Sequence, residues 1–220
     1  MKLKYLAAGM TIFTPLIFSQ SAKNKFINEK AVFVVDIQPR YIEHVLQDEL
    51  KSDIKSIAEL LIHAKKEKMP VYVFEIENNE IYKENADPGF KSENNGTIDT
   101  LAKIINSMPK EQVHRYNSKT DSKIISDLKE HKVKKIIGAG VYSTACLKQA
   151  LYFAEKKGFD TYTAPDISLN AFIVTEDSAK EVFKNFGIEY LKNSKEFYNN
   201  KINDNNINNQ IKNTKKHMRK

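Results

Sequence analysis

The stretch Ala-Val-Phe-Val-Val-Asp-Ile-Gln at residues 31–38 decides the fold. Its first five residues are apolar without alternation, which is typical of a strand buried on both faces, as in a parallel sheet. The strand ends in Asp36, an acidic residue that an apolar core does not require. The stretch therefore predicts a parallel sheet with a polar group at the carboxyl end of a strand, where open α/β sheets bind their ligands.

The rest of the chain alternates between helical and strand patterns. Helices are expected over 40–66, 97–107, 121–131, 143–157 and 175–186, and further strands over 71–74, 112–115, 135–139, 160–164 and 188–190. A polar stretch with proline and glycine at 78–96 predicts a long loop. Strands that alternate with helices of this length predict an α/β fold, in which a parallel sheet carries helices on both faces.

Both ends of the chain differ from its centre. Residues 1–22 combine two lysines with an apolar stretch, which is typical of a cleaved signal peptide and predicts a periplasmic or secreted protein; an uncleaved anchor is the alternative. Residues 193–220 contain nine asparagines and few apolar side chains, so we expect a basic, disordered tail after a domain at 23–192. The alternative is that this tail contacts an anionic lipid or polymer surface. No other segment is apolar for long enough to span a membrane.

The positive charge lies at the ends. The chain has a net charge of +7, of which residues 191–220 carry +6 and residues 1–22 carry +2, so that residues 23–190 carry −1. A nucleic-acid-binding domain would carry its basic residues on one folded face. We therefore expect no nucleic-acid partner.

Cys146 is the only cysteine, so it cannot form an internal disulfide. It lies in the first turn of the predicted helix 143–157, where a helix N-terminus lowers a thiol pKa and offers backbone N–H groups to an oxyanion. Asp36 belongs to the same edge of the predicted sheet and is a candidate base. Each residue also has a structural alternative, since a lone cysteine is often a packed small residue and an aspartate after a strand often caps a turn.

Two motifs together resemble a known family. The strand that ends Val34-Val35-Asp36-Ile37-Gln38 and the stretch Gly-Val-Tyr-Ser-Thr-Ala-Cys at 140–146 are similar to the isochorismatase-like cysteine hydrolases, which include nicotinamidases. Their patterns are an apolar strand ending in Asp-x-Gln, and Gly-Val-x-[Ser/Thr]-x-x-Cys entering a helix. The resemblance covers about residues 30–190. It implies a six-stranded Rossmann-like parallel sheet.

The resemblance also implies a mechanism. Cys146 would attack a carbonyl or related carbon to give a thioester that water hydrolyses, and Asp36 would accept the thiol proton. Backbone N–H groups of Ala145 and Cys146 would form the oxyanion hole, and a cis peptide bond would fall at Val141–Tyr142.

The third catalytic residue is harder to assign. The family has a lysine at the end of the third strand, where an alignment without gaps places Val113. Arg115 lies two residues further on, on the same side of the strand, and Lys119 lies in the following loop, so either could supply the positive charge. An arginine in this place could not shuttle protons, because its pKa stays above about 12. Arg115 is taken as the candidate catalytic cation and Lys119 as a residue that contacts the substrate.

The remaining expectations concern ligands and partners. Gln38, Tyr41 and Tyr142 are expected to line the pocket for a small-molecule substrate. No metal is expected, because the five histidines are scattered and none follows the second strand at Glu75, and no cofactor is expected, because the glycine pattern at 138–143 is incomplete. The resemblance implies a hydrolase of a small amide, ester or related C–N bond, and a homo-oligomer. The alternative is a binding protein that keeps the fold without turnover.

Overall fold

The protein is built on one parallel sheet. The computed structural model describes residues 28–43, 45, 47–76, 96–170 and 174–199. Within them the strands are β1 (Lys30–Val35), β2 (Val71–Phe74), β3 (Val113–Tyr116), β4 (Lys135–Val141), β5 (Asp160–Thr163), β6 (Ser168–Leu169) and β7 (Glu189–Tyr190). Their order is β3-β2-β1-β4-β5-β7, neighbouring strands pair in parallel, and the short β6 pairs with the end of β4.

The described part of the sheet therefore has seven strands rather than the six that the resemblance implied. The additional strand is β6, whose two residues continue the sheet past the carboxyl end of β5 and align with Gly140 and Val141. The α/β class and the parallel arrangement are confirmed.

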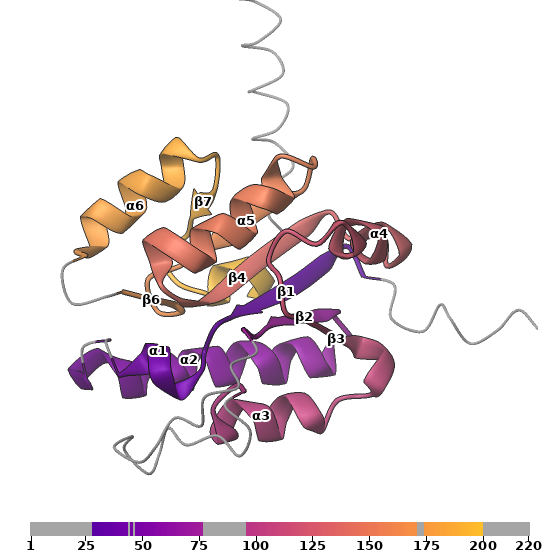
Figure 1. Ribbon diagram of the computed structural model, residues 1–220, viewed down its shortest axis with the longest axis horizontal. Coiled ribbons are helices and arrows are strands. Elements are labelled where there is room, and N and C mark those ends of the chain that lie inside the picture. The colour runs from indigo at the N-terminus through magenta and orange to yellow at the C-terminus, as the bar shows by residue number, and fades with distance from the viewer. Residues whose placement is uncertain (1–27, 44, 46, 77–95, 171–173, 200–220) are drawn as a thin grey trace, which may run out of the picture.

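Helices cover both faces of the sheet (Figure 1). They are α1 (Pro39–Ile42), α2 (Gln47–Lys66), α3 (Asp99–Asn106), α4 (Ser122–Glu130), α5 (Lys148–Glu155), α6 (Glu176–Asn185) and α7 (Lys195–Asn199). A short 3₁₀ helix, Lys110–Gln112, precedes β3, and a π-helical turn, Ser143–Leu147, precedes α5. Helices α2 and α3 lie against one face, and α4, α5 and α6 against the other.

The central strand β1 explains why both faces are covered. Successive side chains of a strand point to opposite faces. Val32 and Val34 join the cluster beneath α2 and α3, whereas Phe33 and Val35 join the cluster beneath α4, α5 and α6. All four are at most 1% exposed, as the unbroken apolar run in the sequence predicts.

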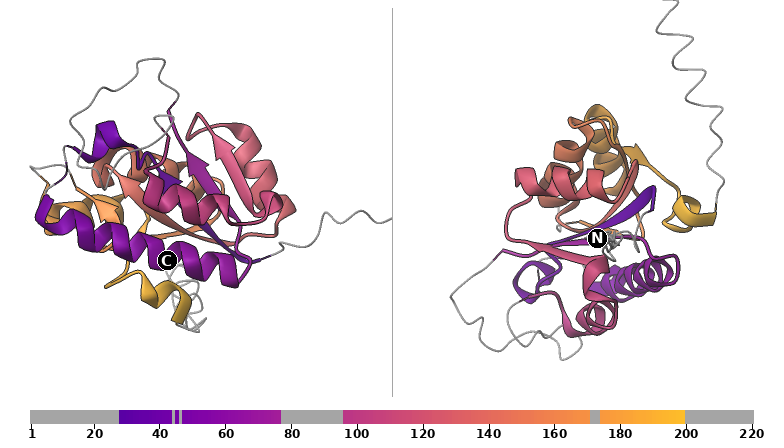
Figure 2. Two further views of the ribbon diagram at one scale, coloured as in Figure 1. Left: turned by 90° about the horizontal axis from the view of Figure 1, so that it is seen from below. Right: turned by 90° about the vertical axis from the view of Figure 1, so that its right-hand side faces the viewer.

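Two element boundaries differ from the sequence prediction. The helix expected over 40–66 is divided, because α1 ends at Ile42 and α2 begins at Gln47, with Val45 buried between them. Residues 195–199, assigned to the disordered tail, form α7, whose Phe197 is fully buried. Lys195 of α7 pairs with Glu59 of α2 at 3.1 Å, and the two helices lie side by side in Figure 2.

Among the described residues, no helix is long and apolar enough to cross a membrane. The predicted signal peptide at 1–22, most of the loop at 78–96, and residues 200–220 of the tail lie outside the described residues.

Candidate active site

Asp36 follows β1 directly and adopts an unusual backbone conformation. Its φ is 51°, which is in the left-handed region that non-glycine residues rarely occupy. Its N–H donates to the carbonyl of Phe74 at 3.0 Å, and its carbonyl accepts from the N–H of Gln38 at 2.8 Å. Such a conformation costs about 1–3 kcal/mol and persists where the surroundings enforce it, often at functional sites. The turn places the carboxylate in the interior, where the residue is only 1% exposed.

Lys119 supplies the positive charge beside this carboxylate. It lies in the loop after β3, and its Nζ is 2.7 Å from Oδ2 of Asp36. The lysine side chain is 9% exposed and that of the aspartate 1%. Removing either charge from water alone would cost several kcal/mol, so each of the two groups makes the burial of the other tolerable.

Cys146 lies within the π-helical turn that begins α5, and its thiol lies within electrostatic reach of Asp36. The pKa of the thiol is raised to about 11, first by burial and then by Asp36, while the charge of Lys119 and the backbone of Tyr142 act to lower it. The net pKa is therefore raised, whereas the position of Cys146 at a helix N-terminus predicted a lowered one. The resting residue is a neutral thiol that faces a carboxylate.

Gly140 is what allows the cysteine turn to approach β1 so closely. Its φ is +147°, and a Cβ at this position would lie 2.1 Å from the carbonyl oxygen of Val35. Any side chain here would collide with the strand that carries Asp36. The peptide bond between Val141 and Tyr142 is cis, as the resemblance implied.

Arg115 is placed elsewhere. Its Nη1 is 2.9 Å from Oε2 of Glu75, and its Nη2 donates to Oδ1 of Asn106 at 3.0 Å. The side chain is 43% exposed. Oε1 of Glu75 also accepts from the N–H and the hydroxyl of Thr97, at 2.6 and 2.7 Å. The structure thus joins Arg115 to the segment after β2, and brings Lys119 rather than Arg115 to Asp36.

The predicted pocket residues have different surroundings. Tyr41 is half-buried with its ring 6.2 Å from that of Tyr142 in an edge-on arrangement. Burial raises the pKa of its hydroxyl, the charge of Arg40 opposes this rise, and Asp36 and Cys146 contribute to it, so Tyr41 lies within electrostatic reach of the site.

Gln38 and Ala145 are engaged with backbone groups. The side chain of Gln38 donates to the carbonyl of Ile76 at 3.2 Å and accepts from its N–H at 3.1 Å, which fixes the chain just after β2. The N–H of Ala145 donates to the carbonyl of Tyr142 at 3.0 Å, so in this structure it is committed to the turn rather than to an oxyanion. Both residues hold the site in shape.

Sequence reasoning gave Lys119 a secondary place, because nothing in a loop fixes how far a side chain reaches. One signal was available: an aspartate at the end of a buried strand needs a nearby cation, and Lys119 is the lysine that follows β3 most closely. Among the described residues there is no group of three or more His, Cys, Asp or Glu side chains arranged to hold a metal ion.

Comparisons with known proteins bear on the family and the fold. The family model for the isochorismatase domain matches residues 30–191. No curated protein matches the sequence. Among solved structures, the MAR1 ribonuclease of Caenorhabditis elegans is 16% identical with a TM-score of 0.59, and 78% of this chain covers 80% of it.

Two further structures are similar. The nicotinamidase PncA of Bacillus subtilis is 13% identical with a TM-score of 0.58, over 75% of this chain and 100% of that one. The YcaC gene product of Escherichia coli, an octameric hydrolase of unknown specificity, is 19% identical with a TM-score of 0.55, over 77% and 76% of the two chains. At these identities the structures show a shared α/β fold. Together with the family model, they identify the chain as a member of the isochorismatase family.

Proposed function

We propose that the protein is a cysteine hydrolase that cleaves a small amide, ester or related C–N bond. The observation that carries the proposal is the buried ion pair of Asp36 and Lys119, 2.7 Å apart, which acts on the pKa of the Cys146 thiol. A buried charge pair contributes little to stability on its own, so its place beside the only cysteine calls for another explanation. General base catalysis on the thiol is that explanation.

In the first step, Cys146 Sγ bonds to the carbonyl carbon while its proton passes to the carboxylate of Asp36. Collapse of the tetrahedral adduct breaks the C–N or C–O bond, the proton moves from Asp36 to the leaving group, and a thioester remains. Because the pKa of the thiol is about 11, proton transfer accompanies attack instead of preceding it.

In the second step, a water molecule gives a proton to Asp36 and adds to the thioester. The thiolate leaves, takes the proton back from Asp36, and the acid product departs. Lys119 balances the negative charge of Asp36 between these transfers and holds the carboxylate in place. The backbone N–H of Cys146 is our candidate oxyanion donor, with Tyr41 and Tyr142 beside the reacting carbon.

The proposal extends to location and assembly. The character of residues 1–22 supports export to the periplasm or beyond, which N-terminal sequencing of the mature protein from fractionated cells would test. The octameric state of the E. coli YcaC gene product supports a homo-oligomer, which light scattering would test.

The mechanism is tested by alkylation of Cys146 with iodoacetamide as a function of pH, in the wild type and in Asp36→Asn, alongside hydrolysis of a panel of small amides and esters. Asp36→Asn removes the negative charge that favours the neutral thiol. We expect the apparent pKa to fall below about 11, so alkylation at neutral pH becomes faster. Hydrolysis should nevertheless fall by about 10²- to 10⁴-fold, because the base is lost.

These opposite responses distinguish a base from a residue that merely tunes the thiol. Cys146→Ser is the control, and should neither react with iodoacetamide nor hydrolyse any member of the panel. If Asp36→Asn leaves the pKa of Cys146 unchanged and no amide or ester is turned over by the wild type, the alternative of a binding protein without turnover replaces the proposal.

A further inference from the structure

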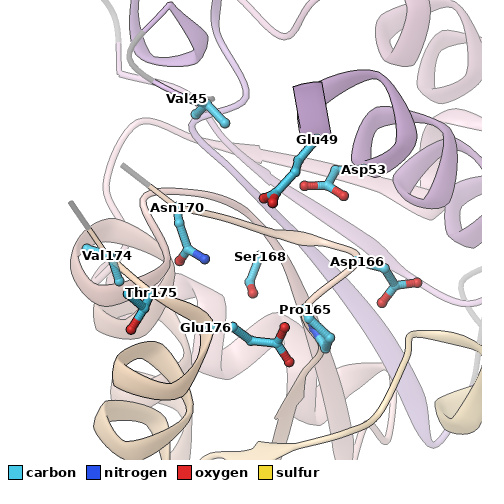
Figure 3. Close-up of a pocket in the computed structure, with 10 residues that line it drawn as sticks. All are labelled: Val45, Glu49, Asp53, Pro165, Asp166, Ser168, Asn170, Val174, Thr175 and Glu176. Carbon is cyan, nitrogen blue, oxygen red and sulfur yellow. The ribbon is translucent and has the colours of Figure 1, made fainter. Parts of the chain in front are cut away.

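A second site of unusual charge lies beside the candidate active site. It is a cavity of about 510 Å³, here named the acidic pocket, between the start of α2, the chain from β5 to β6 and the start of α6 (Figure 3). Four carboxylates line it: Glu49 and Asp53 from α2, Asp166 from the turn after β5, and Glu176 from α6. Neither Asp36, Lys119 nor Cys146 is among its lining residues.

No cation of the described residues is paired with these four carboxylates. Asp166 accepts hydrogen bonds from the N–H and hydroxyl of Ser194, at 2.8 and 2.7 Å, and Lys195, within electrostatic reach of it, pairs with Glu59 instead. The pKa of Asp53 is raised to about 6, first by burial and then by the charges of Glu49 and Asp166, while a hydrogen bond from Ser52 opposes the rise. The acidic pocket thus holds negative charge that the described residues do not neutralise.

The floor of the acidic pocket carries a second, independent feature. Ser168 is 1% exposed, and its hydroxyl has no hydrogen-bond partner of normal geometry. Tyr190, whose pKa Ser168 lowers, faces it, but neither hydroxyl completes a hydrogen bond with a described group. In Figure 3 the side chain of Ser168 lies amid the carboxylates. A buried hydroxyl without a partner costs about 1–3 kcal/mol, which a ligand that donates a hydrogen bond would recover.

The spacing of the carboxylates decides which cation fits. Within the described residues no three of them come close enough together to hold a metal ion. They act on one another electrostatically nonetheless, since Glu49 and Asp166 both raise the pKa of Asp53. Negative charges that come from separate elements around one cavity match a ligand whose positive charges are also separated, with N–H donors at each.

We propose that the acidic pocket binds a linear organic polycation of the di- or polyamine class, with ammonium groups at Glu49 and Asp53 on one side and at Asp166 and Glu176 on the other. Ser168 accepts a hydrogen bond between them. The neighbouring Asn170 accepts a hydrogen bond from the hydroxyl of Ser143, the first residue of the turn that carries Cys146. The acidic pocket does not include the ion pair at Asp36. The hydrogen bond between Ser143 and Asn170 nevertheless links the acidic pocket to the turn that carries Cys146.

The test is isothermal titration of the full chain with spermidine at low ionic strength and at about pH 7.5, where Asp53 is mostly ionised. We expect saturable binding that Asp53→Asn and Glu176→Gln each weaken by about fivefold, the effect of losing one partly exposed charge pair. Glu130→Gln in α4, which makes the same charge change away from the acidic pocket, should leave the affinity unchanged. Cys146→Ser should also bind spermidine normally, so the result does not depend on the proposed hydrolase activity.

Magnesium at matched ionic strength provides the comparison with a simple cation. Equal affinity for magnesium and spermidine, or equal spermidine affinity in Asp53→Asn, Glu176→Gln and Glu130→Gln, would mean general attraction of cations and would overturn the proposal. Because both pocket carboxylates are at least partly exposed, their variants are expected to fold, and thermal unfolding verifies this.

Discussion

The candidate active site and the acidic pocket both place carboxylates at the carboxyl side of the sheet, but only the first provides them with cations. In the active-site region Asp36 is paired with Lys119 and Glu75 with Arg115. In the acidic pocket the described residues supply no ion pair to Glu49, Asp53, Asp166 or Glu176, and the pKa of Asp53 is raised to about 6. A carboxylate that is paired with a cation of the chain is positioned for proton transfer. A carboxylate without such a cation favours the binding of a cationic ligand.

The two ion pairs of the active-site region also differ from each other. The Asp36–Lys119 pair is buried, and the Glu75–Arg115 pair is partly open to water, with 43% and 21% of the arginine and glutamate side chains exposed. Water screens the second pair, so its contribution to stability is small. The charges that act on the pKa of the Cys146 thiol are those of the buried pair.

The largest expected effect comes from removing the cation beside Asp36, so that this carboxylate is left without a charged partner like those of the acidic pocket. Lys119→Met leaves a buried carboxylate without its cation, which costs about 3–5 kcal/mol of unfolding free energy. Any hydrolysis should fall by at least about 100-fold, because an aspartate that takes up a proton no longer acts as a base. Urea unfolding and turnover measure the two effects.

The double variant Asp36→Asn with Lys119→Met provides the control. With both charges removed, most of the lost stability should return, while activity should not. If Lys119→Met alone unfolds at the same urea concentration as the wild type, the buried pair does not contribute to the free energy of unfolding. The proposed difference between the active-site region and the acidic pocket would then be wrong.

An intermediate effect is expected at the more exposed pair. Glu75→Gln weakens the bonds that Oε1 accepts from the N–H and hydroxyl of Thr97, so we expect a loss of about 1–2 kcal/mol. Arg115→Met removes only the partly exposed cation and should cost less than about 1 kcal/mol. The same urea measurements rank the two. A larger loss for Arg115→Met than for Lys119→Met would reverse the proposed order of the two cations.

Much of this arrangement could be predicted from the sequence. The unbroken apolar run before Asp36 predicted a strand buried on both faces, because such a pattern has few other stable solutions. The succession of strands and helices along the chain, and the place of Cys146 after β4, followed from the alternation of elements and from the two motifs. These signals are local in sequence, so a single chain suffices to read them.

What the sequence did not predict depends on distances between segments. The choice of Lys119 over Arg115 at Asp36 depends on the path of the loop after β3, and the pKa of Cys146 depends on burial and on a carboxylate 110 positions away. Residues 195–199 looked like part of an asparagine-rich tail, but the buried aromatic side chain of Phe197 and the pair of Lys195 with Glu59 hold α7 against the domain. The average composition of a segment does not reveal a single aromatic residue of this kind.

The smallest expected effect is a gain of stability instead of a loss, and it comes from removing the charge of Asp53 in the acidic pocket. An acid whose pKa is higher in the folded protein binds its proton more tightly when folded, so its contribution to stability is greatest below the unfolded value near 3.8 and is lost as pH rises through about 6. At neutral pH the ionised carboxylate of Asp53 is therefore destabilising.

The variant Asp53→Asn should recover part of this free energy. The full pKa shift corresponds to about 3 kcal/mol, and solvent screening of this partly exposed side chain reduces the expected gain to about 1 kcal/mol. Urea unfolding at about pH 7.5 and about pH 4 measures it: the gain should be present at the higher pH and nearly absent at the lower one. Loss of stability at neutral pH would show that Asp53 is already neutralised within the chain, and the distinction between the two regions would disappear.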